Sequence, residues 1–308
     1  MSADVLIFVV GGTLAAATAM LFAALGEAVA ERAGILNLSV EGMMATGAAA
    51  AFGVATLSGS HVLGFTAGAI AAALLSAVFA LLVLVFYANQ VAAGLAVGIL
   101  GLGISAFIGK PFEGTTIAKL PKLDIAGLSD LPMLGPILFR HDVMVYLGIA
   151  MVFAVAFLFN RTRSGLIIRA VGENPRTAAA NGTPVRRVRF CAIAFGGLLA
   201  GIGGAYLSIA YTALWAEGLI AGRGWIAVAL VVFGAWRPGR IALGAYIFGG
   251  ISLLELSLQS QGVRIPSQLL SASPYLVTIL LLAFISRDQY RLRQSRPLAL
   301  GQTYRNEN

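Results

Sequence analysis

Two polar side chains, Asn37 and Glu41, stand in the stretch AGILNLSVEG, at the entry to an apolar run of residues 40–58. An amide or a carboxylate in an apolar environment is costly to bury, so it usually binds a polar solute, carries an ion or hydrogen-bonds the backbone. Gly34 and Gly42 close by predict a broken or re-entrant helix near 31–42. Asn37 and Glu41 therefore either line a transport path or cap the break, and the two roles can coexist.

Three further polar residues lie in or beside apolar runs. Glu255 is the only charge in the run 241–258, where it either serves transport or makes a structural hydrogen bond. Asn89 and Gln90 begin the run 89–109, where they either gate a path or cap a helix. The candidate path residues are Asn37, Glu41, Asn89, Gln90 and Glu255.

The sequence lacks the arrangements that support catalysis or metal binding. It contains no G-x-x-x-x-G-K-[ST] phosphate-binding loop, so we expect no ATPase site of its own. His61 and His141 lack ligand spacing, and Cys191 is the single cysteine. We therefore expect a protein that is not an enzyme, with no catalytic residue, no cofactor and no metal site.

The stretch GENPRTAAANG (residues 172–182) carries start and stop signals for a short helix. Asn174 is a good N-cap, and Pro175 suits the first helical position, where its missing N–H costs nothing. Asn181 and Gly182 favour a left-handed stop. A helix over 175–181 is predicted, and it is either an incidental loop helix or a rigid contact for a partner protein.

The composition indicates how these residues are positioned. Hydrophobic residues make up 59% of the 308 positions and charged residues 11%, with a mean hydropathy of +0.89. This balance predicts an all-α polytopic transmembrane helix bundle in contact with membrane lipid. The net charge of +8 does not indicate a nucleic-acid partner, because the Lys and Arg residues cluster beside apolar runs, as membrane topology explains.

About nine spans (8–10) are predicted, within a single transmembrane domain over 1–308. Seven arginines against one acid make 161–189 a cytoplasmic loop, and the basic tail 287–308 is also placed inside. Counting the spans from this loop puts the N-terminus outside and the C-terminus inside. The apolar runs are 5–25, 40–58, 62–87, 89–109, 142–160, 190–211, 218–236, 241–258 and 272–286.

The region between the sixth and seventh runs holds Glu217 and Arg223, which flank an expected outer turn. Both can reach water there, and they either help to dock an outer partner or are simply solvated. Trp215 and the aromatic residues near it are expected to pack or to lie at the membrane interface, although a nucleobase would need such a stacking surface.

Six sequence blocks occur in a fixed order along nearly the whole chain. Each one is a weak signal, but together they are specific. They are ERAGILNLSVEGMMATGA (31–48), ANQVAAGLAVGILGLGIS (88–105), GLIIRAVGENPRTAAANG (165–182), GIGGAYLS (201–208), AGRGWIAVALVVFG (221–234) and IPSQLLSASPYLVTIL (265–280). With them the chain resembles inner-membrane permease subunits of bacterial ABC importers. The resemblance is to the branched-chain amino acid and simple-sugar permease family, and most closely to its nucleoside permeases.

The resemblance implies a type II importer in the bacterial plasma (inner) membrane. Its partners would be an ATP-binding cassette subunit, a second permease subunit, often a different chain, and an extracytoplasmic substrate-binding protein. The short cytoplasmic helix would then be the coupling helix that enters a cleft of the cassette. The residues that fit this pattern are Glu173, Asn174, Pro175, Ala179 and Gly182, whereas Thr183-Pro184 departs from the apolar residue expected after the glycine.

The implied function is that of a permease subunit, which forms the translocation path for a nucleoside or a simple sugar and couples to a separate ATPase subunit. An ion-coupled secondary transporter of a small polar solute, with Glu41 or Glu255 as the coupling group, is the alternative. A receptor-like membrane protein whose loop helix docks a signalling partner is a third possibility. The three classes predict different solute fluxes. A permease subunit needs ATP, a secondary transporter needs an ion gradient, and a receptor-like protein transports nothing.

Overall fold

The computed structural model describes residues 3–123, 127, 129, 131, 134–260, 276 and 296–304. Within these residues no strand occurs, and two isolated bridges join Thr116 to Leu214 and Lys122 to Asp142. The expected all-α fold is therefore confirmed. The elements are α1 (Ala3–Arg32), α2 (Val40–Ser58), α3 (His61–Leu84), α4 (Gln90–Gly109), η1 (Lys110–Phe112), α5 (Leu134–Leu138), α6 (Val143–Arg161), α7 (Arg163–Glu173), α8 (Pro175–Ala180), α9 (Val185–Ala205), η2 (Tyr206–Tyr211), α10 (Arg223–Phe233) and α11 (Pro238–Ser260).

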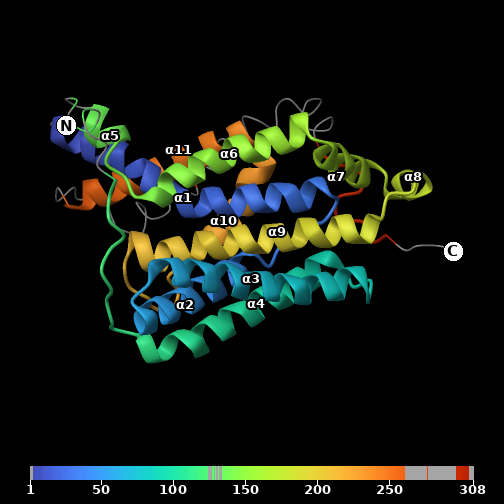
Figure 1. Cartoon of the computed structure of the whole chain (residues 1–308), viewed down its shortest axis with the longest axis horizontal. Coiled ribbons are helices and arrows are strands. Elements are labelled where there is room, and N and C mark those ends of the chain that lie inside the picture. The colour runs from blue at the N-terminus through green and yellow to red at the C-terminus, as the bar shows by residue number, and fades with distance from the viewer. Residues whose placement is uncertain are drawn as a thin grey trace.

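The long helices lie side by side along one axis of an elongated bundle (Figure 1). The short helices α7 and α8 lie at one end of this bundle, and α5 lies at the opposite end, where α1 begins. We call these the α8 end and the α5 end. Several long helices, α1 and α9 among them, run from one end towards the other (Figure 1).

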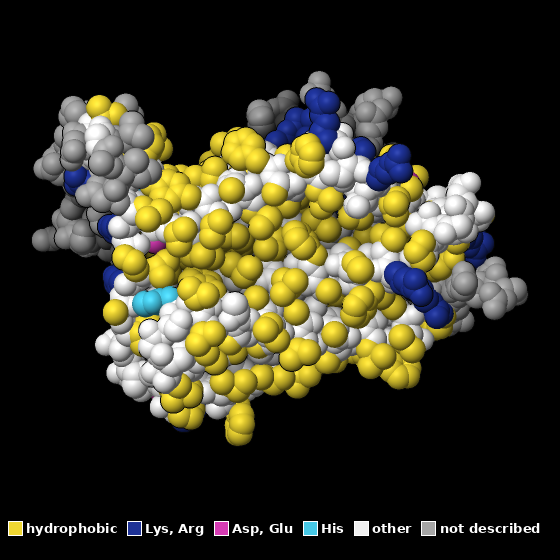
Figure 2. All heavy atoms as spheres, in the orientation of Figure 1, with side chains coloured by type: hydrophobic (Ala, Val, Ile, Leu, Met, Phe, Trp, Pro, Cys, Tyr) yellow, Lys and Arg dark blue, Asp and Glu magenta, His cyan; other side chains and the backbone are white. Residues whose placement is uncertain are grey.

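Among the described residues, seven helices are long and apolar enough to cross a membrane. They are Val9–Arg32, Val40–Ser58, His61–Leu84, Gln90–Phe112, Val143–Arg161, Val185–Tyr211 and Pro238–Gln259. Hydrophobic side chains cover the face between the two ends, and Lys and Arg gather mainly near the α8 end (Figure 2). Phe107 of α4, for example, is 84% exposed. Such a broad apolar belt is suited to lipid.

The expected run 218–236 does not form a continuous span. Its helix, α10, has 11 residues, which is about 16 Å of helix against a hydrocarbon core of about 30 Å. The prediction counted apolar side chains, whereas Gly218 and Gly222 adopt φ of 77° and 83° and keep the preceding backbone irregular. The expected run 272–286 lies outside the described residues except for Leu276.

Close backbone contacts between helices hold the centre of the bundle together. A Cβ on Gly204 of α9 would lie 1.9 Å from the carbonyl oxygen of Met44 on α2. A Cβ on Gly42 of α2 would lie 2.3 Å from the carbonyl oxygen of Gly98 on α4. Only glycine, which has no side chain, permits such distances. In lipid the hydrophobic effect does not drive helices together, so close packing at small residues takes its place.

The helix interruption expected near 31–42 is present between α1 and α2. Residues 33–39 are non-helical and largely buried, and Gly34 adopts a φ of 84°. This segment runs beside the first half of α4, because the Leu36 N–H donates to Oε1 of Gln90 at 2.8 Å and Gly94 faces Leu38. The start of α2 is therefore placed inside the bundle rather than at its end.

Candidate functional site

The carboxylate of Glu41 joins the N-termini of two helices. Its two oxygens accept hydrogen bonds from the N–H groups of Gly222 and Gly224, each at 2.7 Å. Glu41 lies in the first turn of α2, and Gly222 is the N-cap of α10. Both helix N-termini carry a positive partial charge, so a carboxylate is stabilised between them. We call this arrangement the Glu41 contact.

The backbones of the two helices approach closely at the Glu41 contact. A Cβ on Gly224 would lie 2.5 Å from the Glu41 backbone. The contact is level with the middle of α4, because the neighbouring Gly42 packs on Gly98 and Gly101. The irregular segment before α10 therefore ends deep inside the bundle, where a carboxylate satisfies its free N–H groups.

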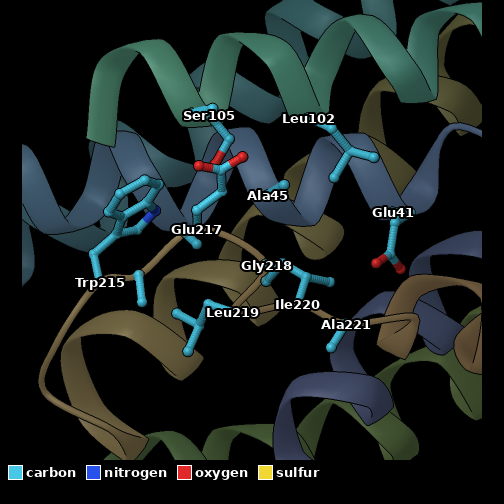
Figure 3. Close-up of a pocket in the computed structure, with 13 residues that line it drawn as sticks. Glu41, Ala45, Leu102, Ser105, Trp215, Glu217, Gly218, Leu219, Ile220 and Ala221 are labelled. Carbon is cyan, nitrogen blue, oxygen red and sulfur yellow. The ribbon is translucent and has the colours of Figure 1, made fainter. Parts of the chain in front are cut away.

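A cavity of about 330 Å³ extends from Glu41 towards the α5 end. It is lined by α2, by α4 and by the irregular segment of residues 215–221 (Figure 3). Trp215 marks its other end, since its indole packs on Gly109, the last residue of α4. The lining is mainly apolar and includes the polar side chains of Glu41, Ser105, Trp215 and Glu217. A few polar groups in an apolar cavity are typical of small-molecule sites.

Asn37 lies at the helix break as expected, with its side chain turned to its own segment. It is 1% exposed, and its Oδ1 accepts from the N–H and the hydroxyl of Ser39 at 3.0 and 2.5 Å. Its own N–H donates to Oε1 of Glu27 at 3.1 Å. This geometry stabilises the break, as the capping alternative requires.

Asn89 and Gln90 are neighbours with different surroundings. Asn89 is exposed, and its Oδ1 accepts from the N–H groups of Val91 and Ala92, so it caps α4. Gln90 is 2% exposed and is hydrogen-bonded to the 33–39 segment through Leu36. Asn89 therefore serves its own helix, whereas Gln90 ties the helix break to α4.

Glu255 is separate from the cavity. It lies on α11, which packs on α1, and its Oε1 accepts from Nε2 of Gln259 at 3.1 Å. It is not among the residues that line the cavity. The structure thus brings Glu41 to the cavity and leaves Asn37, Asn89, Gln90 and Glu255 at other positions.

Sequence reasoning missed two buried acids on α1. Glu27 and Glu31 are 1% and 0% exposed, and Glu31 Oε2 accepts from Nε1 of Trp236 at 2.6 Å. Oε2 of Glu27 and Oε1 of Glu31 have no hydrogen-bond partner among the described residues. Their spacing of four residues in GEAVAER puts both on one helix face, which was a usable signal. The predicted run ended at residue 25, before these charges, whereas α1 continues to Arg32.

The short helix α8 spans Pro175–Ala180, one residue shorter than predicted. Asn174 caps it as expected, since its side chain accepts from the Thr177 N–H at 3.0 Å. Gly182 adopts a φ of 79° and its N–H donates to the Ala179 carbonyl at 2.8 Å. Glu173, Asn174 and Gly182 are exposed, whereas Pro175 and Ala179 are half-buried. The helix projects from the end of the bundle (Figure 1), where its outer face is open to a partner.

A small apolar cluster fixes α8 to the bundle. It consists of Val171 from α7, Ala178 from α8 and Val185 from α9, with Ala179, Val188 and Tyr304 packed against it. Because α8 lies between α7 and α9 in the chain and packs on both in this cluster, a displacement of α8 would act on both.

The segment 296–304 also packs at the α8 end, which sequence reasoning did not foresee. The Ala299 N–H donates to the Gly172 carbonyl at 2.9 Å, and the Gly301 N–H donates to the Gly34 carbonyl at 3.3 Å. Ala299 is 2% exposed. These bonds connect the end of α7 to the helix break between α1 and α2.

The carbonyl oxygen of Gln302 accepts hydrogen bonds from two side chains. Nε2 of Gln90 donates to it at 3.2 Å, and Nη1 of Arg189 donates at 3.4 Å. Arg189 is 1% exposed, and its Nε donates to the Ala33 carbonyl at 3.2 Å. The segment 296–304 therefore joins α4, α7, α9 and the 33–39 segment.

Comparison with known proteins agrees with this architecture. A family model described as "Branched-chain amino acid transport system / permease component" matches residues 9–285. The "Putative glucose ABC transporter permease protein TsgC13" of Haloferax volcanii is 40% identical over 317 residues, covering 96% of each chain. No solved structure matches the chain.

Two further relatives are permeases with nucleosides in their names. The guanosine ABC transporter permease protein NupQ of Bacillus subtilis is 35% identical over 213 residues, 65% of this chain and 67% of its own. The nucleoside ABC transporter permease protein NupC of Lactococcus lactis is 30% identical over 288 residues, 89% of this chain and 91% of its own. The resemblance inferred from the six sequence blocks is confirmed. Given the extent of the family match and the seven apolar helices, the chain belongs to the branched-chain amino acid transport system permease family and is a multi-pass plasma-membrane protein.

Proposed function

We propose that this ABC transporter permease forms the path for a simple sugar or a nucleoside and is driven by a separate ATPase subunit through α8. The observation that carries the proposal is α8 itself, a capped helix that projects from one end of the bundle with an exposed outer face. The relatives named for glucose, guanosine and nucleosides support the choice of solute. The chain supplies no ATPase chemistry in this proposal, so the energy comes from its partner.

The α8 end is proposed to face the cytoplasm. The arginines between α6 and α9 support this orientation by the positive-inside bias. It places the start of α1 and the cavity's Trp215 end towards the outside. If the irregular segment and α10 together make one crossing, and 272–286 makes another, the chain crosses nine times with its N-terminus outside and its C-terminus inside.

The cavity is proposed as the outer part of the path, with the Glu41 contact as its inner limit. A broken crossing that ends at helix N-termini is a common place for a transport site. Opening towards the cytoplasm then requires α10 to separate from α2, which breaks two hydrogen bonds to Glu41. The helix break of 33–39 and the segment 296–304 connect this region to α7 and α8.

The proposed assembly contains three kinds of partner besides lipid. An ATP-binding cassette subunit binds α8 through Glu173, Asn174, Pro175, Ala179 and Gly182. A second permease chain completes the path, and an extracytoplasmic binding protein delivers the solute to the α5 end. In this assembly residues 1–308 act as one transmembrane permease domain.

Reconstitution in proteoliposomes tests the proposal. The chain is incorporated alone or with its second permease and ATPase subunits, the binding protein is added outside, and uptake of glucose and guanosine is measured with and without internal ATP. The proposal expects uptake only from the complete assembly with ATP. Uptake by the chain alone under a proton or sodium gradient would contradict it and would favour a secondary transporter.

A further inference from the structure

We propose that Glu217, Ser105 and Trp215 form a subsite that recognises the hydroxyl groups of an uncharged ring and disfavours anions. This inference rests on the proposed function, because it assigns a role to residues of the same cavity. We call the three residues the hydroxyl subsite. They line the part of the cavity that lies away from Glu41 (Figure 3).

The polar groups of the subsite are free to bind a solute. Glu217 is exposed, and within the described part of the chain its carboxylate makes no hydrogen bond or ion pair. Ser105 is 6% exposed and its hydroxyl likewise has no partner there. Elsewhere in these helices such hydroxyls bond to their own backbone, as Ser76 does to the Ala73 carbonyl at 2.8 Å. A buried, unused hydroxyl that lines a cavity is therefore available to a ligand.

The three side chains face a common space. Figure 3 shows the Glu217 side chain extending towards Ser105 on α4, and the nitrogen-bearing edge of Trp215 turned towards Glu217. The Trp215 ring is held in place by its contact with Gly109 and is 3% exposed. A rigid indole, a helix-borne hydroxyl and a carboxylate thus surround one part of the cavity.

Their hydrogen-bonding capacities match those of a polyhydroxylated ring. A carboxylate only accepts, an indole N–H only donates, and a serine hydroxyl does both. Each sugar hydroxyl also donates and accepts, so neighbouring hydroxyls can donate to Glu217 while an oxygen accepts from Trp215. The apolar remainder of the lining, which includes Ala45, Ala48 and Leu102, suits the C–H faces of such a ring.

The charge of the cavity argues against anionic solutes. Among the described residues, its lining includes two carboxylates and neither lysine nor arginine. The guanidinium of nearby Arg223 is bound to the Leu219 and Ile220 carbonyls, with its Nη1 at 2.9 and 3.2 Å from their oxygens. A phosphate placed beside Glu217 would meet a like charge in an apolar surrounding, which raises its energy. The subsite should therefore bind free sugars or nucleosides and disfavour their phosphates.

Direct binding to the permease tests the inference, because a transport assay also reports recognition by the binding protein. The complete transporter is placed in lipid nanodiscs without binding protein, and binding of glucose, 2-deoxyglucose, guanosine, glucose 6-phosphate and guanosine monophosphate is measured by equilibrium dialysis. Glu217→Gln, Ser105→Ala and Trp215→Phe each remove one interaction and keep most of the side-chain volume. Glu113→Gln is the control, since Glu113 is exposed and lies outside the cavity lining.

The inference expects Glu217→Gln to weaken binding about tenfold, as the loss of a charge-assisted hydrogen bond implies. Ser105→Ala and Trp215→Phe should weaken it less, and Glu113→Gln should have no effect. The two phosphates should bind weakly to every form that keeps the Glu217 carboxylate. Weakening for glucose or for guanosine alone supports the subsite and identifies which ring it reads.

Unchanged binding in Glu217→Gln, or phosphates that bind as well as neutral rings, would overturn the inference. So would an absence of direct binding in a wild-type transporter that imports solute in proteoliposomes. If the complete assembly imports nothing with ATP, the proposed function fails instead, and the two failures are thereby distinguished.

Discussion

At the level of single residues, the main finding is that Glu41 connects α2 to the N-terminus of α10. Its position after a helix break made it a candidate for a path or a cap, and the structure shows that it caps a second helix 181 residues away in sequence. Sequence could not reveal that partner, because nothing in Gly222 or Gly224 marks them as donors to a distant carboxylate. The visible signals were the helix break before Glu41 and a charge at an apolar run, and neither identifies the partner.

Replacing Glu41 tests how much the Glu41 contact contributes. Glu41→Ala leaves two N–H groups without an acceptor and should lower the free energy of unfolding by about 1–3 kcal/mol. Glu41→Gln keeps one acceptor oxygen and should have a smaller effect. Thermal unfolding in detergent measures both, and an unchanged melting temperature in Glu41→Ala would show that α10 is held in another way.

The close backbone contact between α2 and α9 leads to a second prediction about single residues. Gly204→Ala puts a methyl group 1.9 Å from the Met44 carbonyl, so α2 and α9 must separate, at a cost of about 1–3 kcal/mol in unfolding free energy. Gly103→Ala is the matched control, because a Cβ there meets nothing within 4 Å. It should stabilise α4 by about 0.5–1 kcal/mol. Equal melting temperatures for the two variants would rule out tight α2–α9 packing.

At the level of elements, caps and apolar length predicted most helices well. The run 40–58 coincides with α2, which its apolar length predicted, and the capped stretch 175–181 matches α8 except for its last residue. The helix α10 was misjudged, since its 11 residues are stabilised by tertiary contacts and the glycines before it were read as part of an apolar run. The packing of 296–304 had no local signal at all, because it rests on backbone hydrogen bonds to distant carbonyls.

The C-cap of α8 gives a prediction for coupling. Gly182→Val forces a β-branched residue into a φ of 79°, which costs roughly 1–2 kcal/mol and should loosen the end of α8. Gly182→Asn keeps a residue that tolerates this conformation and serves as the control. In the reconstituted transporter the ratio of solute imported to ATP hydrolysed should fall for Val and stay near the wild-type value for Asn. The same ratio in both variants would mean that this cap has no part in coupling.

The packed segment 296–304 gives a second element-level prediction. Ala299 is 2% exposed and Leu298 is 70% exposed, so Ala299→Arg should displace the segment, whereas Leu298→Arg should leave it in place. Hydrogen–deuterium exchange of the peptides covering 296–304 and 33–39 measures the effect. Faster exchange is expected only for Ala299→Arg, and slow exchange in both variants would contradict the proposed tie between the segment and the helix break.

At the level of the whole molecule, composition and the six sequence blocks were sufficient for the fold class and the family. The membrane bundle follows from apolar length and the glycine content, which are properties of the entire chain. The site was predicted less completely. Glu41 was predicted as a path or cap residue, and the structure places it at the cavity. Ser105 carries no sequence signal, and Trp215 was predicted only to pack, to lie at the interface or to stack, so the fold alone places these two at the same cavity.

We propose that α8 contacts the ATPase subunit at the cytoplasmic end of the molecule, and photo-crosslinking tests this contact directly. Thr177, which is exposed on α8, is replaced by a photo-crosslinking residue in the complete transporter, and exposed Thr115, which follows η1 beyond the opposite end of α4, is replaced as a control. Irradiation should join position 177 to the ATPase subunit and leave position 115 without that product. A cross-link to the ATPase subunit from position 115, or none from position 177, would contradict both the orientation and the coupling role of α8.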